Sequence, residues 1–346
     1  MINLRVISLS IVMVFLSVSN LFAQDERVVT EADMPRIPHT NPKDALSTFK
    51  VADGFELELV AAEPLVADPV AACFDEHGRM FVAEMHGYPF SQEPTQLNPE
   101  GGGLKDAGII RMLEDIDKDG KMDRSTVFAD NLSWPTSVLP YNGGIFVMAP
   151  KFLYYLKDTD GDNKADVREI VLEGFGRNNV QSVANGLIWG LDNKIYFAAG
   201  RNPKTLVHRG TPLFPVSGVD LRFDPRTEKF ELVTGGVQFG HARDIWGTRF
   251  VCSNSNHIQQ IIHPQHYITR NPYLVASGMI SSIATDGASA RVFRLSPPEP
   301  WRIVRQKWRA LDKGYRLVIN DDGGWEFIPI DSSKAAGVVP TEYPVG

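Results

Sequence analysis

Short apolar runs of four to six residues, separated by turn residues, recur along most of the chain. In the first set, runs at 70–74, 81–83, 109–113 and 125–128 are separated by polar turns such as Asp75–Gly78. Runs of this length that end at Asp, Asn or Gly predict β-strands. The same order returns at 137–172, at 187–233 and again from Ala242, where Asp244–Gly247 precedes runs at 250–252 and 257–262. The pattern predicts four antiparallel units of about four strands each.

One aromatic residue marks the second strand of every unit. Phe81, Phe146, Tyr196 and Phe250 follow one another at intervals of 65, 50 and 54 residues. Propeller blades repeat at about 40 to 50 residues, so this spacing favours a β-propeller with insertions. A plain β-sandwich is the alternative. The alternating run at 55–60 is typical of an edge strand, and its N-terminal position suits the strand that closes a propeller ring.

The first residues predict an exported protein. Arg5 precedes an apolar run, and Met1–Ala23 ends before the polar Gln24, which is the pattern of a signal peptide. A membrane anchor is the alternative, but it needs about 20 apolar residues, and serines interrupt this run. Residues 24–45 are polar and aperiodic and predict a leader, and 46–346 form the predicted β-domain. No later run is apolar enough to cross a bilayer, so the mature chain is expected in the periplasm or outside the cell.

Charge and cysteine content exclude two classes of partner. The net charge is −7 and no basic run is present, which argues against nucleic acid. Cys73 and Cys252 are too few for a disulfide framework and lack the spacing that attaches haem.

Two predicted turns share one spacing of carboxylates. Asp residues stand at positions 1, 3, 5 and 9 of each loop, which suits calcium because this ion prefers six to eight oxygen ligands. Glu169, at position 12 of the second loop, adds another carboxylate. The predicted calcium ligands are Asp115, Asp117, Asp119, Asp123, Asp158, Asp160, Asp162, Asp166 and Glu169. Solvated acidic turns are the alternative.

Strand order places both acidic loops at one end of the units and the long polar loops at the other. Those loops contain basic, amide and imidazole side chains that suit an anionic planar cofactor or a sugar. The predicted cofactor-binding residues are Arg177, Asn178, Arg201, Arg243, Gln238 and Trp134, with Asn179, Gln181, His208, Arg209, Asn254, His257 and His86 near them. His241, expected at the entry to an inner strand, is the predicted general base.

Several stretches resemble the membrane-bound dehydrogenase N-terminal domain family of planctomycetes, verrucomicrobia and their relatives. They are Gly54–Glu56 with Ala62–Pro64, Arg79–Met85, Leu132–Thr136, Asn185–Asp192, Arg222–Arg226 and Phe250–Ser255. That family is similar to the soluble quinoprotein glucose and sorbosone dehydrogenases. The resemblance implies a six-bladed β-propeller, a pyrroloquinoline quinone (PQQ) site and a cytochrome c partner or downstream domain. Where the quinoprotein relatives have a catalytic histidine before an inner strand, this chain has Gln181–Asn185, which departs from the pattern.

These observations leave two main hypotheses about function. The first is an exported oxidoreductase that acts on a sugar or sugar-derived alcohol. The second is a non-catalytic propeller that binds carbohydrate or a partner protein, and a propeller hydrolase such as a lactonase is a minor third. Because four blades are recognisable and the resemblance implies six, we also expect an all-β fold that is an incomplete propeller, truncated at its C-terminal end and oligomeric or poorly soluble by itself.

Overall fold

The chain forms two separate units of unequal size. The computed structural model describes residues 29–36, 38–90, 100–102, 106–202, 205–276, 278–289, 299–319 and 325–331. The larger unit contains 41–291, and the smaller one combines 1–40 with 292–346. This division differs from the single β-domain expected over 46–346. The predicted signal peptide lies outside the described residues.

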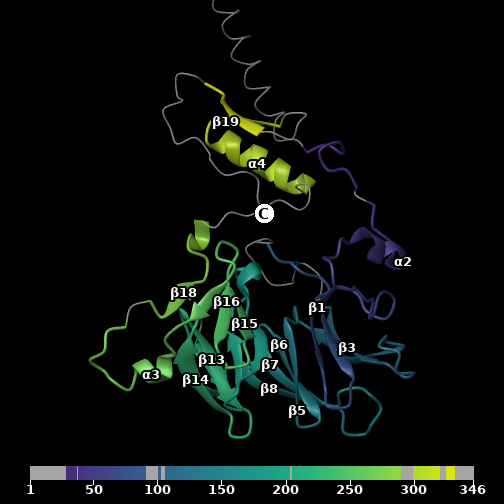
Figure 1. Cartoon of the computed structure of the whole chain (residues 1–346), viewed down its shortest axis with the longest axis vertical. Coiled ribbons are helices and arrows are strands. Elements are labelled where there is room, and N and C mark those ends of the chain that lie inside the picture. The colour runs from purple at the N-terminus through teal and green to yellow at the C-terminus, as the bar shows by residue number, and fades with distance from the viewer. Residues whose placement is uncertain are drawn as a thin grey trace, which may run out of the picture. The chain divides into compact units, whose positions relative to one another are not determined.

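Four antiparallel meanders make up the larger unit (Figure 1). The first sheet contains β1 (Pro69–Phe74), β2 (Met80–Glu84), β3 (Gly108–Glu114) and β4 (Arg124–Leu132). The second contains β5 (Ser137–Tyr141), β6 (Gly144–Ala149), β7 (Phe152–Lys157) and β8 (Val167–Glu173). The third contains β9 (Asn185–Trp189), β10 (Ile195–Ala198), β13 (Val219–Asp224) and β14 (Lys229–Thr234). The fourth contains β15 (Phe239–Arg243), β16 (Arg249–Cys252), β17 (Gln259–Ile261) and β18 (Ile280–Ser282). The four predicted meanders are therefore present.

The first strands of the four sheets lie next to one another in chain order. β1 contacts β5, β5 contacts β9, and β9 contacts β15. The sheets thus stand face to face around their first strands, a propeller-like arrangement. One apolar core lies between the first and second sheets, and another between the second and third. Every residue of β6 is buried because both faces of its sheet are covered.

The loop between β10 and β13 forms a hairpin. Its strands β11 (Thr205–His208) and β12 (Thr211–Pro215) extend the second sheet, because β11 pairs with the outer strand β8. His208 and Arg209 therefore lie at the outer edge of a sheet, where both side chains contact Glu228. They were expected near the central channel, and this part of the prediction is wrong.

Two predicted strand positions also differ from the structure. Residues 55–60 form no strand, and Phe55 is 77% exposed. The end of this segment packs on the first sheet, where Met122 N donates to Val60 O. In the fourth sheet the inner strand begins at Phe239, earlier than predicted. Asp244–Gly247 forms the following turn, since Asp244 accepts from two backbone N–H groups and Gly247 has φ +84°.

The smaller unit contains α4 (Pro300–Asp312) and a hairpin of β19 (Tyr315–Ile319) and β20 (Trp325–Pro329). Trp308 lies in α4. Ala310 packs against the hairpin residues Tyr315 and Leu317.

Short helices lie elsewhere in the larger unit. They are α2 (Pro42–Ala45), which falls in the expected leader, α3 (Gln265–Ile268) and the 3-10 turns Leu46–Thr48, Val180–Ser182 and Gly287–Ser289. Within the described residues, none of the helices combines the length and apolarity that a membrane crossing requires.

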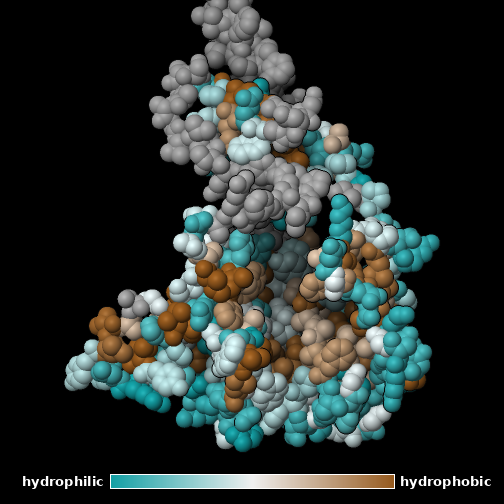
Figure 2. Space-filling model, in the orientation of Figure 1, coloured by the Kyte–Doolittle hydropathy of each residue, from teal (hydrophilic) through white to brown (hydrophobic). Residues whose placement is uncertain are grey.

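Hydrophobic surface gathers over the part of the larger unit that carries β18 and α3 (Figure 2). Exposed apolar side chains in this part include Leu274 at 49%, Val275 at 93% and Ile283 at 53%.

Candidate ligand-binding site

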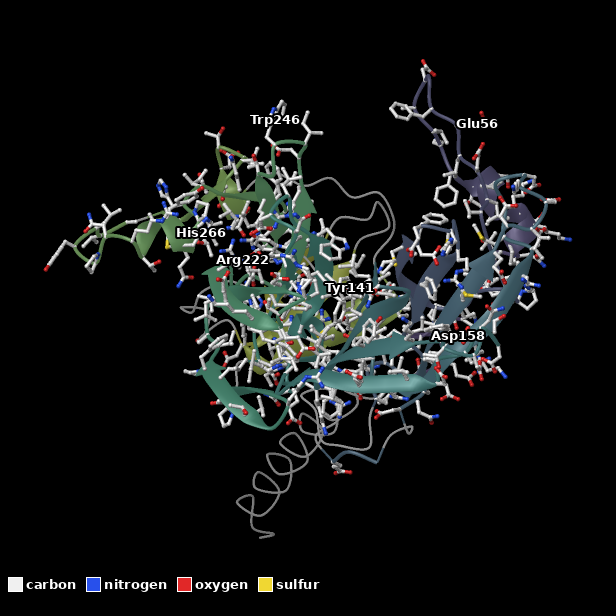
Figure 3. The ribbon with its side chains drawn as sticks, turned by 90° about the horizontal axis from the view of Figure 1, so that it is seen from below. Glu56, Tyr141, Asp158, Arg222, Trp246 and His266 are labelled. Carbon is white, nitrogen blue, oxygen red and sulfur yellow. The ribbon has the colours of Figure 1, made fainter. Side chains whose placement is uncertain are left out.

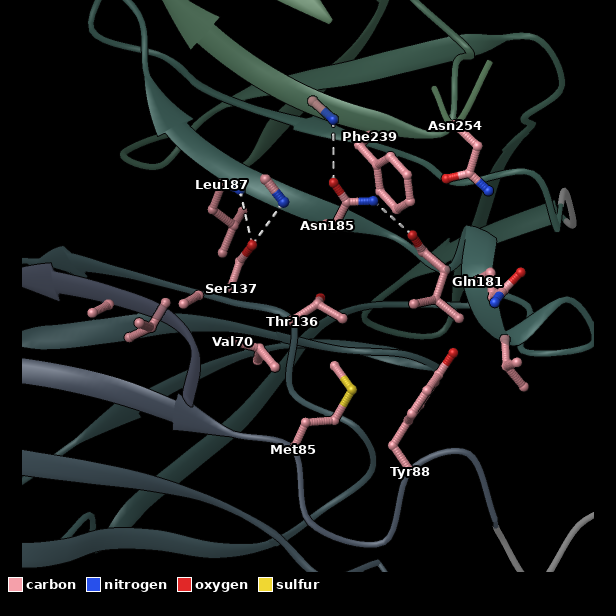
Figure 4. A pocket seen from close by; sticks show the side chains of 17 residues that line it. Val70, Met85, Tyr88, Thr136, Ser137, Gln181, Asn185, Leu187, Phe239 and Asn254 are labelled. Atoms are coloured by element: carbon pink, nitrogen blue, oxygen red, sulfur yellow. Dashed lines mark hydrogen bonds between the residues drawn. The ribbon is translucent and has the colours of Figure 1, made fainter. Parts of the chain in front are cut away.

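A pocket of about 600 Å³ lies where the four inner strands begin (Figure 4). Each sheet contributes the start of its first strand, and the loop after β2 and the link before β9 add side chains. The lining residues are Val70, Ala71, Ala72, Met85, Tyr88, Thr136, Ser137, Val138, Val180, Gln181, Val183, Asn185, Gly186, Leu187, Phe239, Gly240 and Asn254. The volume is in the range of small-molecule sites.

Three of the polar lining side chains hold the inner strands together. Ser137 Oγ accepts from Gly186 N at 2.7 Å, and Thr136 Oγ1 donates to Ala184 O at 2.7 Å. The Asn185 amide donates to Val183 O and accepts from Gly240 N, as the dashed lines of Figure 4 show. These bonds join the second, third and fourth sheets at the pocket floor.

Close backbone approach explains the glycine at the floor. Gly186 has φ +71°, and a Cβ at this position would lie 2.1 Å from Gly240 O. Any other residue would push β9 and β15 apart, since a Cβ cannot approach an oxygen so closely. Gly186 therefore allows the third and fourth sheets to meet beneath the pocket.

Three other polar side chains face the pocket without a protein partner. The Tyr88 hydroxyl and the side-chain amides of Gln181 and Asn254 make no hydrogen bond to the residues that the structure describes. Gln181 and Asn254 are exposed, and Tyr88 is 37% exposed. Burial raises the pKa of Tyr88 above its ordinary value of 10, so the hydroxyl stays protonated. Together these groups offer donors and acceptors without a formal charge.

None of the 17 lining residues is charged. Arg177, a predicted cofactor ligand, lies behind the pocket wall. Its guanidinium donates to Ser133 Oγ and lies over the Trp134 ring, 5.0 Å from the ring centroid. Trp134 itself is 3% exposed and packs with Val180 and Val183. Arg177 and Trp134 therefore support the wall behind the pocket and do not line it.

The remaining predicted cofactor ligands are spread over different surroundings. Gln238 is 5% exposed and bridges Gln181 O and Asn254 N, so it positions both pocket amides from behind. Asn178 and Arg201 are exposed, outside the lining. Arg243 lies at the far end of β15, where it lines a second cavity. The predicted ligand set is therefore not one site.

His241 lies inside β15 and not at its entry. Its side chain is 0% exposed, with Nδ1 3.1 Å from Arg249 Nη2 and Nε2 3.4 Å from Asp220 Oδ2. The second contact is not aligned as a hydrogen bond. Burial, and then the charge of Arg249, hold the pKa of His241 well below 6.5. An imidazole enclosed in this way does not face the pocket, so the assignment as general base is corrected.

The acidic loops lie at the opposite end of the sheets, after β3 and β7. Carboxylate oxygens of Asp115, Asp117 and Asp119 lie within 4.8 Å of one another, and so do those of the second set, Asp158, Asp160 and Asp162. Figure 3 shows Asp158 at the edge of the larger unit.

The other predicted calcium ligands are placed differently. Asp123 and Asp166 instead accept from the backbone N–H groups of Ile116 and Thr159. Glu169 lies on β8, where it contacts Arg209 at 3.1 Å, and it is not part of the carboxylate set of Asp158, Asp160 and Asp162.

The pocket does not match PQQ, the cofactor that the sequence resemblance implies. That cofactor is a planar tricarboxylate, and carboxylates are bound in proteins by arginine, lysine or a metal ion. The pocket offers neutral amide and hydroxyl groups instead. We derive no redox step from this site.

Gln181 and Asn254 belong to the wider polar set predicted from the sequence, whereas Tyr88 and Phe239 do not. Tyr88 lies in a long loop whose path no local pattern determines. Phe239 lies three residues before the predicted start of its unit. If the predicted strand had begun at Phe239, both Phe239 and Gly240 would have been assigned to the pocket.

Fold and site together define a mainly antiparallel β-sheet protein with a neutral, ligand-sized pocket at the start of its inner strands. The chain belongs to a family described as a domain of unknown function, DUF7133, whose profile matches residues 41–316. None of the curated proteins matches it.

Several solved structures are distantly similar. An auxiliary nutrient binding protein from Bacteroides thetaiotaomicron is 15% identical, with a TM-score of 0.35 over 56% of this chain and 37% of the other. A β-propeller domain from Myceliophteria thermophila is 12% identical, with a TM-score of 0.31 over 60% of this chain and 55% of that domain. A catalytically inactive virginiamycin B lyase from Staphylococcus aureus, solved with quinupristin, is 10% identical, with a TM-score of 0.36 over 79% and 88%. The chain thus spans little more than a third of the nutrient binding protein.

Proposed function

We propose that this chain binds a neutral, hydroxyl-rich small molecule, of the carbohydrate class, in the pocket at the start of its inner strands. The observation that carries the proposal is the set of three unpartnered neutral groups, the Tyr88 hydroxyl and the Gln181 and Asn254 amides, around a pocket without charged lining. Each group can both donate and accept, which matches hydroxyl groups that do the same. Phe239, 36% exposed, adds an apolar face for a sugar ring.

Binding is favoured over catalysis because none of the described lining residues is a histidine, a carboxylate, a lysine or a cysteine. Ser137, the one lining serine, has its oxygen engaged by the backbone of β9. A general base must lie within hydrogen-bond reach of the proton that it removes, and the part of the lining that the structure describes contains neither an imidazole nor a carboxylate. The oxidoreductase activity implied by the sequence resemblance remains a prediction.

A glycan array followed by calorimetry tests the proposal. We expect the protein to bind at least one neutral sugar, and the double variant Gln181→Ala/Asn254→Ala to bind it about tenfold more weakly, since each lost hydrogen bond contributes about 0.5 to 1.5 kcal/mol. Asn178→Ala is the matched control, because Asn178 is an exposed amide outside the lining. No sugar binding by the wild type, or equal loss in the control, would contradict the proposal.

We also propose that the four sheets are blades of a six-bladed type of β-propeller. The contacts of β1 with β5, β5 with β9 and β9 with β15 support this arrangement. A crystal structure of the purified protein tests it, because a sandwich would pair the sheets two by two, without a shared axis.

Calcium at the two acidic loops is a further proposal, with a structural role. Three carboxylates in each loop lie close enough for one ion. Melting temperatures measured with calcium and with chelator test this proposal.

A further inference from the structure

A second cavity, of about 420 Å³, lies between the third and fourth sheets. Its walls come from β10, the end of β15, the start of β16, β17 and the segment that leads into α3. The lining residues are Tyr196, Val233, Arg243, Trp246, Gly247, Thr248, Arg249, Gln260, Ile261, Ile262, Pro264, His266 and Tyr267. Figure 3 shows Trp246 at the tip of the β15–β16 turn and His266 near Arg222.

Arg243 enters this cavity with most of its guanidinium unpaired. The guanidinium carbon lies 4.0 Å from the centroid of the Tyr196 ring, and Nη1 donates to Gly247 O at 3.3 Å. Nε and Nη2 are buried and have no hydrogen-bond partner. Stacking on Tyr196 fixes the plane of the guanidinium, so these two donors have a set direction.

Arg249 supplies a second buried guanidinium. The residue is 7% exposed, and its Nη groups contact Thr234 O at 3.0 Å and Asp220 Oδ2 at 3.5 Å. Its Nε is buried without a partner. Burial lowers the pKa of Arg249 to about 10, so it still carries its positive charge at neutral pH.

The charges around the cavity leave it positive. Arg243 and Arg249 line it, and none of the 13 lining residues is acidic. Asp220 contacts Arg249 from behind, and its single carboxylate offsets at most one of the two positive charges. Arg222, whose guanidinium carbon lies 5.8 Å from the centroid of the Tyr196 ring, is already paired with Asp192 and Glu231.

Buried N–H donors without acceptors are unfavourable, because folding removes their hydrogen bonds to water and supplies none in return. An oxygen-bearing anion would accept from these donors and balance the charge, because guanidinium groups bind carboxylates and phosphates in a fork geometry. Two aromatic side chains line the same cavity as the arginines and are accessible, since Trp246 is 79% exposed and Tyr267 is 57% exposed. Their rings offer a surface on which a flat or apolar ring can pack.

We propose that this cavity binds a small organic anion, a carboxylate or phosphate ester attached to a ring, with its oxyanion on Arg243 and Arg249 and its ring against Tyr267 and Trp246. The site is distinct from the neutral pocket at the start of the inner strands. It lies between two sheets and uses none of the same lining residues.

Calorimetry with benzoate, benzamide and inorganic phosphate tests this site on the full chain. Benzoate and benzamide share a ring and differ in charge, so we expect benzoate to bind at least tenfold more tightly. Phosphate should compete with benzoate, and raising the salt concentration should weaken both. Absence of benzoate and phosphate binding by the wild type, or equal affinity for benzoate and benzamide, would overturn the proposal.

Variants distinguish binding at this site from nonspecific attraction of anions to positive charge. Arg243→Gln should weaken benzoate binding at least tenfold, whereas Arg226→Gln, an exposed arginine on the β13–β14 turn, should leave it unchanged. Tyr267→Ala removes an exposed ring, which keeps the test valid if Arg243→Gln fails to fold. That variant should weaken benzoate binding and leave phosphate binding unchanged. Equal binding by the wild type and Tyr267→Ala would exclude the proposed ring contact.

Discussion

Asp220 and His241 lie against each other between the third and fourth sheets, and neither side chain is exposed. Burial raises the pKa of Asp220 to about 6, and this effect outweighs the opposite influence of Arg249. In the same environment, burial lowers the pKa of His241. Both shifts favour the neutral form, as expected for ionisable groups in a region of low dielectric. The folded state therefore disfavours the charged form of each group.

The raised pKa of Asp220 predicts the direction of a pH dependence. The folded state binds the proton more tightly than the unfolded state, so the contribution of Asp220 to stability is greatest below its unfolded pKa of 3.8 and is lost as pH rises through about 6. The stability of the wild type relative to Asp220→Asn should therefore fall between pH 4.5 and pH 7.5. Urea unfolding of both proteins at several pH values measures this difference. A stability difference between the two proteins that rises with pH would contradict the raised pKa of Asp220.

Glu84 is a buried carboxylate with three partners. It accepts from Ala67 N and from Arg111 Nε, both at 2.8 Å, and Oε2 lies 2.9 Å from His86 Nε2. Breaking a buried ion pair at one partner costs about 3 to 5 kcal/mol, so Glu84→Gln should lower the free energy of unfolding by roughly this amount. Chemical unfolding measures it, with Glu76→Gln as the control, since the side chain of Glu76 is 63% exposed. Similar losses in the two variants would show that the Glu84 contacts contribute little.

Residue roles were harder to predict than residue positions. Gln181 and Asn254 lie at the pocket as expected, because loop order alone places them there. The positions of Arg243 and His241 depend on where β15 begins. That start lies three residues before the predicted one, so His241 lies within the strand and not in the loop before it.

At the scale of elements, strands with a clear pattern were predicted correctly. The strands of the first three sheets follow apolar runs that end at turn residues, and the two carboxylate loops join the expected strands. The β11–β12 hairpin was not predicted, because its residues contain proline and glycine and their strand pairing depends on the edge of β8.

The helix α4 follows a periodic pattern of apolar residues in the sequence. Trp301, Val304, Trp308 and Leu311 recur at intervals of three or four residues, which is typical of a helix face. Pro300 at the first turn and Gly314 after the last are ordinary boundaries of a helix.

The calcium proposal is tested at the two loops. Ligand binding to the folded state alone adds about 2.7 kcal/mol at a hundredfold excess over Kd, so calcium should raise the melting temperature relative to chelator. The double variant Asp117→Asn/Asp160→Asn should lose most of this increase. Asp44→Asn/Asp53→Asn is the control, because these acidic residues are exposed outside the loops. If calcium does not change the melting temperature of the wild type, the calcium proposal is wrong.

At the scale of the whole molecule, the sequence predicted the class of fold and the separation between acidic loops and polar loops. It did not predict the charge of the central pocket. Arg177, Arg201 and Arg243 were predicted to bind a cofactor there. Arg177 packs on Trp134, however, and Arg243 lines a different cavity. Long-range packing between sheets decides which loop side chains face a pocket, and no local pattern records that packing.

One calorimetric comparison distinguishes neutral ligands at the central pocket from anions at the second cavity. The sugar identified on the array and benzoate are each titrated into the wild type, Gln181→Ala/Asn254→Ala and Arg243→Gln. We expect the amide variant to bind the sugar about tenfold more weakly and benzoate with unchanged affinity. The arginine variant should bind the sugar with unchanged affinity and lose its affinity for benzoate. Sugar binding that survives in the amide variant, or that disappears with Arg243, would contradict the assignment of the central pocket.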